Sequence, residues 1–125
     1  MAKVLGIGGI FFKSKDPVAL AAWYQEHLGF NVDGSFGGTV FQASEVPAGG
    51  YTIWGPFKAD TTYFTPSDSR YMINLMVDDL GEALKQVQSG GATLVGEPES
   101  SEFGDFGWFM DPDDNKIELW QPPQA

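Results

Sequence analysis

The first apolar pattern with helical spacing lies in the opening quarter of the chain. Asp16 ahead of it suits the N-cap position, Pro17 suits the first helical residue, and Gly29 stands where a helix would end. The apolar stripe consists of Leu20, Trp23, Tyr24 and Leu28. The pattern therefore predicts an amphipathic helix that begins after Asp16 and ends before Gly29.

A second helical pattern follows in the other half of the chain. Asp79 suits its N-cap, and Glu82 stands three residues later, where it can return a hydrogen bond to the cap. The apolar stripe consists of Leu80, Ala83, Leu84 and Val87. The Gly90-Gly91 pair then marks the end of this second predicted helix.

Short apolar or alternating runs, bounded by Gly, Pro and Ser, predict strands around the two helices. Their ranges are 4–13, 30–33, 38–43, 51–54, 71–77, 93–95, 106–110 and 116–120. Residues 56–70 show no clear period and are predicted to form a connector. Residues 96–102 are predicted to form an acidic loop.

The last two predicted strands form a hairpin around Asp111-Pro112-Asp113-Asp114-Asn115, where Pro and Asx residues favour a tight turn. The second of these strands places Glu118 in its middle. Because side chains alternate along a strand, Glu118 shares a face with Lys116 and Trp120 and lies opposite Ile117 and Leu119. The apolar face must be buried, so Glu118 faces either solvent or a cavity.

The order of predicted elements recurs along the chain. The same spacing separates Asp16 from Asp79, and Gly9 from Met72. Such a repeat predicts an α+β fold of two tandem βαβββ modules related by a pseudo-twofold axis. We place both modules in a single domain spanning residues 1–125, with module one at about 4–56, the connector at about 57–70 and module two at about 71–122.

Composition narrows the possible partners. The chain has 125 residues and a net charge of −10, and it contains no Cys. This charge argues against nucleic acid as a partner, and it suits a cationic small molecule or serves solubility alone. Without Cys there is no disulfide, thiol nucleophile or Cys-bound zinc.

Near the N-terminus, Lys3 precedes an apolar run that is too short to span a bilayer and is followed by no small-residue cleavage site. We expect a cytoplasmic protein with no membrane partner.

Three motifs resemble those of the vicinal oxygen chelate superfamily, which includes glyoxalase I, extradiol dioxygenases and bleomycin-resistance proteins. The motifs are DPVALAAWYQEHLGF from Asp16, INLMVDDLGEAL from Ile73 and DPDDNKIELWQP from Asp111. The resemblance extends from about Gly6 to Pro122. It implies the glyoxalase/bleomycin-resistance fold, in which paired βαβββ modules form an open, barrel-like cleft, often in a homodimer.

The resemblance also identifies the positions that hold a metal in metal-dependent members: Gly9, Thr52, Met72 and Glu118. Only Glu118 carries the usual type of ligand, because Gly9 has no side chain and a Met thioether suits hard or borderline divalent ions poorly. His27 is the single His of the chain, and we place it on the helix side of the sheet, away from the cleft. We therefore expect no metal site and no cofactor.

Aromatic and polar residues that share the predicted cleft face form a candidate ligand site. The candidate ligand-binding residues are Phe11, Thr52, Trp54, Met72, Asn74, Trp108, Glu118 and Trp120, although the face of Trp108 depends on a register that the sequence does not fix. Glu118 has three possible roles: contact with a ligand, general base or acid in catalysis, or a relic satisfied by Thr52 or Asn74.

We expect a metal-free glyoxalase/bleomycin-resistance-like protein that binds a small aromatic or cationic organic molecule in an acidic, tryptophan-lined cleft. One alternative is a metal-dependent lyase, isomerase or dioxygenase of the same superfamily. A second is a metal-free isomerase that uses Glu118 as base, and a third is a module without a ligand. Residues 96–107 form either a solvated loop or a mobile lid over the cleft.

Overall fold

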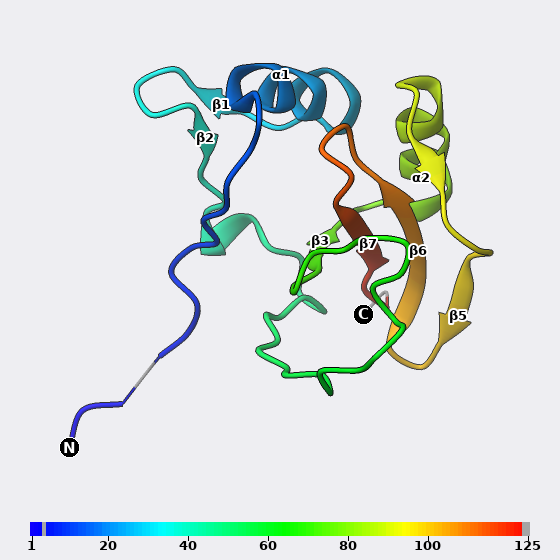
Figure 1. Ribbon diagram of the computed structural model, residues 1–125. Helices are drawn as coiled ribbons and strands as arrows, with labels where there is room; N and C mark the ends of the chain where they lie inside the picture. Colours follow the sequence, from blue (N-terminus) through cyan, green and yellow to red (C-terminus); the bar gives the residue numbers. More distant parts are fainter. Residues whose placement is uncertain (4, 124–125) are drawn as a thin grey trace.

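The computed structural model describes residues 1–3 and 5–123 and shows a mixed α+β protein with one open sheet (Figure 1). The helices are α1 (Pro17–Leu28), α2 (Leu80–Ser89) and the short 3-10 helix η1 (Ala43–Glu45). The strands are β1 (Val32–Asp33), β2 (Gly38–Thr39), β3 (Ile73–Met76), β4 (Thr93–Leu94), β5 (Glu99–Ser101), β6 (Gly104–Met110) and β7 (Lys116–Gln121).

The main sheet has the strand order β3-β7-β6-β4, with β5 paired to the start of β6. β3 runs parallel to β7, and β6 runs antiparallel to β7 as the predicted hairpin. The register places Asn74 and Trp108 on either side of Glu118. Cross-strand neighbours point to the same face of a sheet, so these three side chains form one row across it.

Both helices lie on the opposite face of the main sheet, where the apolar core is buried (Figure 1). The core consists of Leu20, Tyr24, Leu80, Ala83, Leu84, Val87, Phe109, Ile117 and Leu119. Ile117 and Leu119 supply the apolar face of β7, as its alternation predicts. Within the described residues, neither helix is long and apolar enough to cross a bilayer.

The predicted helix starts are confirmed. The Asp16 side chain accepts from the Ala19 backbone N–H at 3.1 Å, and the Asp79 side chain accepts from that of Glu82 at 3.1 Å. Within the described residues, the Glu82 side chain makes no return hydrogen bond to the cap. Its carboxylate instead lies 3.6 Å from Lys85 Nζ, one turn further along α2.

The strand predictions for the first half are largely wrong. Residues 5–13 and 51–54 form no strand, while Val4, the first residue of that predicted strand, lies outside the described residues. The regions predicted as 30–33 and 38–43 shorten to β1 and β2, which pair only with each other. A strand needs a hydrogen-bonded neighbour, and the described chain offers none to residues 5–13 or 51–54. The N-terminal segment runs away from the sheet, as Figure 1 shows.

In the second half, the prediction of a loop at residues 96–102 is also wrong in part. Glu99–Ser101 forms β5, because its backbone pairs with Gly104, Asp105 and Phe106 at the start of β6. Over the described residues 1–3 and 5–123, the sheet stays open and closes into no barrel. The division of the chain into modules at about 4–56 and 71–122 stays a prediction.

Candidate functional site

The Glu118 carboxylate lies at the centre of the sheet face that the helices leave uncovered. Asn74 Nδ2 donates to its Oε2 at 2.7 Å, and Trp108 Nε1 donates to its Oε1 at 2.9 Å. A third donor is the Tyr63 hydroxyl, 2.6 Å from Oε1. Glu118 is only 9% exposed, so these donors replace the water that a surface carboxylate would bind.

Two of these donors come from the sheet and one from the connector (residues 57–70). Asn74 and Trp108 are cross-strand neighbours of Glu118 on β3 and β6, so the register fixes their positions. Tyr63 belongs to a turn of the connector, which crosses this face of the sheet. The connector therefore covers Glu118 with an aromatic ring.

Lys116 also contacts Tyr63, through the backbone carbonyl and the ring. It lies two residues before Glu118 on β7, on the same face, and its Nζ donates to the Tyr63 backbone carbonyl at 2.6 Å. That Nζ also stands 5.1 Å from the centre of the Tyr63 ring and 5.9 Å from that of the Trp108 ring, within the range of a cation–π contact. Asn74, Trp108, Lys116, Glu118 and Tyr63 are called the Glu118 cluster below.

Burial changes the proton affinities of two members of the cluster. It raises the pKa of the Tyr63 phenol, and the adjacent Glu118 raises it further. Burial lowers the pKa of Lys116, whereas the negative charge of Glu118 opposes that change. Tyr63 therefore keeps its proton at neutral pH and remains a hydrogen-bond donor to Glu118.

The structure brings some of the predicted site residues together and leaves others apart. Asn74 and Trp108 join Glu118 directly, and Trp120 lies further along the same face of β7, where its Nε1 donates to the Phe103 carbonyl at 2.7 Å. The Trp120 ring stacks on Phe106 and meets Tyr51 edge to face.

The remaining predicted residues belong to segments around the sheet. Met72 is half-buried just before β3. Phe11 and Trp54 are 95% and 80% exposed, and Thr52 is exposed as well, in segments that pair with no strand of the described chain. The structure therefore does not place these three residues beside Glu118.

Two members of the cluster were absent from the predicted site. Strand alternation places Lys116 on the same face as Glu118, two residues earlier, so the sequence could have identified it. Tyr63 lies in the aperiodic connector, and its contact with Glu118 joins positions that are far apart in sequence. No local pattern predicts such a contact.

The four positions that would hold a metal do not fit one. The three donors around Glu118 point N–H and O–H hydrogens at its oxygens. These hydrogens stabilise the Glu118 carboxylate itself and occupy lone pairs that a metal cation would need. Gly9 and Thr52 lie in the exposed segments. Across the described part of the chain, no group of three His, Cys, Asp or Glu residues could hold a metal ion.

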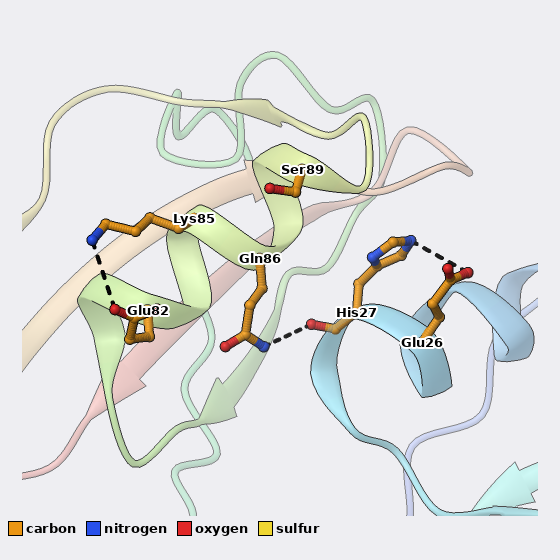
Figure 2. Close-up of a pocket in the computed structure, with 6 residues that line it drawn as sticks. All are labelled: Glu26, His27, Glu82, Lys85, Gln86 and Ser89. Atoms are coloured by element: carbon orange, nitrogen blue, oxygen red, sulfur yellow. Dashed lines mark hydrogen bonds and ion pairs between the residues drawn. The ribbon is translucent and has the colours of Figure 1, made fainter.

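A separate polar hollow of about 410 Å³ lies between the two helices, on the other side of the sheet (Figure 2). Its lining residues are Glu26, His27, Glu82, Lys85, Gln86 and Ser89. The Glu26 carboxylate lies 3.6 Å from the His27 imidazole, and the Glu82 carboxylate lies 3.6 Å from the Lys85 amine. The hollow is open, and every residue that lines it has a polar or ionisable side chain, whereas small-molecule sites are lined mainly by apolar and aromatic side chains.

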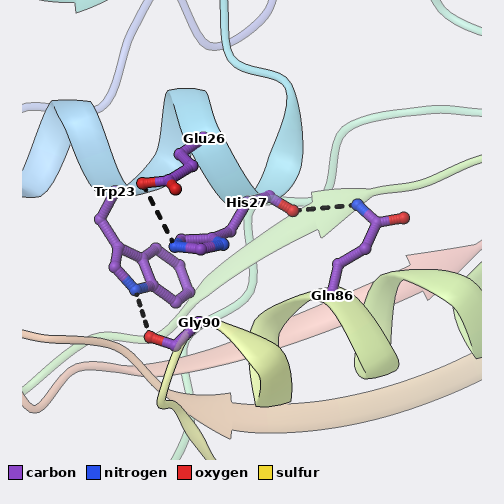
Figure 3. Close-up of polar contacts among 5 residues, drawn as sticks. All are labelled: Trp23, Glu26, His27, Gln86 and Gly90. Atoms are coloured by element: carbon purple, nitrogen blue, oxygen red, sulfur yellow. Dashed lines mark hydrogen bonds and ion pairs between the residues drawn. The ribbon is translucent and has the colours of Figure 1, made fainter.

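Contacts around this hollow join α1 to α2, as Figure 3 shows. Trp23 Nε1 donates to the Gly90 carbonyl at 2.9 Å, and Gln86 Nε2 donates to the His27 carbonyl at 2.9 Å. His27, predicted to lie away from the cleft, is on this helix side, where its ring packs against Trp23. We assign these residues a structural role.

Comparison with solved structures supports the fold. TnmS3, an antibiotic binding protein from Streptomyces sp. CB03234, is 23% identical over 88% of this chain and 89% of its own, with a TM-score of 0.53. A virulence protein from Salmonella typhimurium is 18% identical over 88% of this chain and 90% of its own, with a TM-score of 0.51.

A shorter match has higher identity. A member of the glyoxalase/bleomycin resistance protein/dioxygenase superfamily from Sphaerobacter thermophilus is 36% identical over 39% of this chain, with a TM-score of 0.36. The matched part spans 40% of that protein's chain. No match was found among curated proteins.

The family model of the glyoxalase-like domain matches residues 9–120, nearly the whole chain. This match shows that the chain belongs to the glyoxalase-like domain family, and it agrees with the resemblance of the three sequence motifs to the vicinal oxygen chelate superfamily.

Proposed function

We propose that this protein binds a small aromatic organic molecule at the Glu118 cluster, without a metal. The observation that supports this proposal is a buried carboxylate surrounded by aromatic rings and side-chain donors on the open face of the sheet. Small-molecule sites combine apolar walls with a few polar groups that fix the orientation of the ligand. TnmS3, which shares the fold, is an antibiotic binding protein, so the fold is compatible with such a role.

The charges of the cluster favour an aromatic ligand over a cationic one. The net charge of −10 would attract cations to the protein as a whole. At the site itself, the Lys116 amine lies on the same face as Glu118 and over the aromatic rings. A cationic ligand would therefore meet a like charge beside the carboxylate.

The same contacts argue against Glu118 as a catalytic base. Its two oxygens accept three hydrogen bonds, so of about four acceptor positions only one, on Oε2, is left to take a proton from a substrate. Binding without chemistry requires only that a ligand replace one donor. We therefore prefer the binding role to a metal-free isomerase.

We also infer that the protein forms a homodimer. The segments at residues 5–13 and 51–57 are extended, contain apolar side chains and lack strand partners in the described chain. β3 stands at one edge of the sheet. A second copy would cover such apolar segments and supply backbone partners.

The binding proposal is tested by titrating a panel of aromatic compounds into the protein, with calorimetry as the readout. For a compound that binds, Glu118→Gln should weaken the affinity about tenfold or more, because a hydrogen bond to a charged group is lost. Glu97→Gln, at an exposed loop position, is the matched control and should leave the affinity unchanged. Treatment with a chelator should also have no effect.

Two outcomes would contradict the proposal: equal affinities in the wild type and Glu118→Gln, or loss of binding after chelation. Circular dichroism of each variant checks that the fold is intact.

A further inference from the structure

We propose that Tyr63 is a built-in occupant of the ligand site, and that the natural ligand carries a phenolic hydroxyl that displaces the Tyr63 side chain from Glu118. This inference rests on the proposed function, since it names the class of ligand that the Glu118 cluster would bind. Three observations support it: how Glu118 is held, how Tyr63 is attached, and what surrounds the Tyr63 ring.

First, Glu118 stays oriented when Tyr63 leaves. Asn74 holds Oε2 and Trp108 holds Oε1, and both residues belong to strands of the main sheet. Tyr63 adds a second hydrogen bond to Oε1. Its departure therefore frees one acceptor position on a carboxylate that is already fixed in place.

Second, Tyr63 is attached in a way that permits exchange. It is 39% exposed although the carboxylate that it contacts is only 9% exposed, and it belongs to a connector without helix or strand. Its ring packs mainly on connector residues Phe57 and Phe64 and meets Trp108 edge to face. The sheet holds the Tyr63 side chain through Glu118, Trp108 and the Lys116 amine, and Lys116 also binds its backbone carbonyl. The connector itself has no strand or helix to anchor it, and segments of this kind open at low cost in free energy.

Third, the surroundings of the Tyr63 ring define the chemistry of its replacement. The hydroxyl meets a carboxylate oxygen at 2.6 Å, the Lys116 amine stands 5.1 Å from the ring centre, and the Trp108 ring lies at 84° to it with centres 6.2 Å apart. A carboxylate acceptor, a cation near the ring and an edge-to-face indole together suit an electron-rich ring that bears a hydroxyl.

Other classes of ligand satisfy only part of this arrangement. An aliphatic alcohol can donate to Glu118 but offers no ring to Lys116 and Trp108. An aromatic ring without a donor would take the place of the Tyr63 ring and leave Oε1 of Glu118 with one hydrogen bond fewer. A carboxylate ligand would be repelled by Glu118 itself.

The test uses 4-methylphenol, which reproduces the tyrosine side chain, and 4-methylanisole, in which the hydroxyl proton is replaced by a methyl group. Both are titrated into the wild type, Tyr63→Phe and Glu118→Gln. Tyr63→Phe removes only the competing hydroxyl, so it should bind 4-methylphenol about tenfold more tightly than the wild type. The affinity for 4-methylanisole should change by less than about threefold, and Glu118→Gln should abolish the preference for the phenol.

Hydrogen exchange in the wild type supplies a second readout that does not depend on a variant. Saturating 4-methylphenol should increase deuterium uptake in residues 57–70, because the phenol releases the connector. A connector that instead closes over the ligand would show reduced uptake.

Three results would overturn this inference alone: binding of 4-methylphenol that Tyr63→Phe leaves unchanged or weakens, reduced or unaltered uptake in the connector on binding, or other aromatic compounds binding at Glu118 while 4-methylphenol does not. If no aromatic compound binds any of the three proteins, the proposed function fails as well.

Discussion

Asp111 shows how a single residue connects the two halves of the chain. It is 5% exposed, and its Oδ1 accepts from the backbone N–H groups of Asp113 and Asn115, both at 2.9 Å. Its Oδ2 accepts from the Tyr24 hydroxyl on α1 at 2.9 Å and from the Asn115 side chain at 3.1 Å. One buried carboxylate thus shapes the β6–β7 turn and anchors the first helix to it.

Tyr24→Phe tests this connection. The variant leaves Asp111 with one donor fewer, so the free energy of unfolding at pH 7 should fall by about 2 kcal/mol. Urea unfolding measures the change. Tyr71→Phe, at a partly exposed ring, should change it by less than about 0.5 kcal/mol. Equal effects of the two substitutions would show that the Tyr24 hydrogen bond contributes nothing.

The same tyrosine predicts a loss of stability in alkali. Burial and the neighbouring Asp111 raise the pKa of Tyr24 in the folded protein. Its contribution is fully present below about pH 10, where an unfolded tyrosine also keeps its proton. Above that pH only the unfolded chain releases the proton, so stability should fall by up to about 1.4 kcal/mol per pH unit for this one group. Tyr24→Phe should reduce the slope of stability against pH between 10 and 11.5, and an unchanged slope would contradict this explanation.

Single residues also show what the sequence could and could not predict about the site. Glu118 was predicted because strand alternation separates it from Ile117 and Leu119. The position of Trp108 beside Glu118 could be predicted only from the β6–β7 register, which depends on the turn between the two strands. The contact of Tyr63 with Glu118 could be predicted only from the path of the connector through space, and no local sequence preference determines that path.

At the scale of elements, the approach of α1 to α2 depends on a glycine. Gly90 has an ordinary negative φ of −81°, so backbone strain does not require a glycine there. An added Cβ would, however, lie 2.8 Å from the His27 ring, which packs against Trp23. A side chain at residue 90 would therefore force the His27 ring or the helices to shift.

Gly90→Ala and Gly81→Ala should change stability in opposite directions. Gly90→Ala should lower the free energy of unfolding by about 1–2 kcal/mol, because the new methyl group overpacks the joint between the helices. At Gly81, exposed in the first turn of α2, the nearest atom to an added Cβ is Asp79 Oδ1 at 3.7 Å. Gly81→Ala should raise stability by about 0.5 kcal/mol. Thermal and urea unfolding measure both values, and a shared sign would contradict this packing.

The accuracy of the element predictions follows from what each element needs. Both helices were predicted well because their caps and stripes are local features. The strands expected at residues 4–13 and 51–54 are absent over the described residues 5–13 and 51–54, because strand formation requires a partner, which apolar patterning does not guarantee. β5 was missed because its Glu-Ser-Ser sequence lacks strand character and depends on pairing with β6.

At the scale of the whole molecule, the exposed first half is the basis of the inferred homodimer. Ile53, Trp54 and Phe11 are largely exposed in the two unpaired segments. Sedimentation equilibrium should give the mass of two chains. Trp54→Asp should weaken association at least tenfold, because large aromatic residues dominate interface energies. Phe36→Asp is the matched control: Phe36 is also exposed, but it lies between β1 and β2 and should leave the dimer intact.

A wild-type mass equal to one chain would remove the dimer inference. Association that is lost equally in Trp54→Asp and Phe36→Asp would locate the interface elsewhere.

The most direct test of ligand binding at the Glu118 cluster is the ¹H–¹⁵N spectrum of the tryptophan indole groups. Trp108 donates to Glu118, whereas Trp23 donates to Gly90 on the helix side of the sheet. When an aromatic compound that binds the protein is added, the Trp108 indole signal should shift and the Trp23 signal should stay in place. The shift at Trp108 should disappear in Glu118→Gln. A Trp23 signal that moves while the Trp108 signal does not would contradict this account.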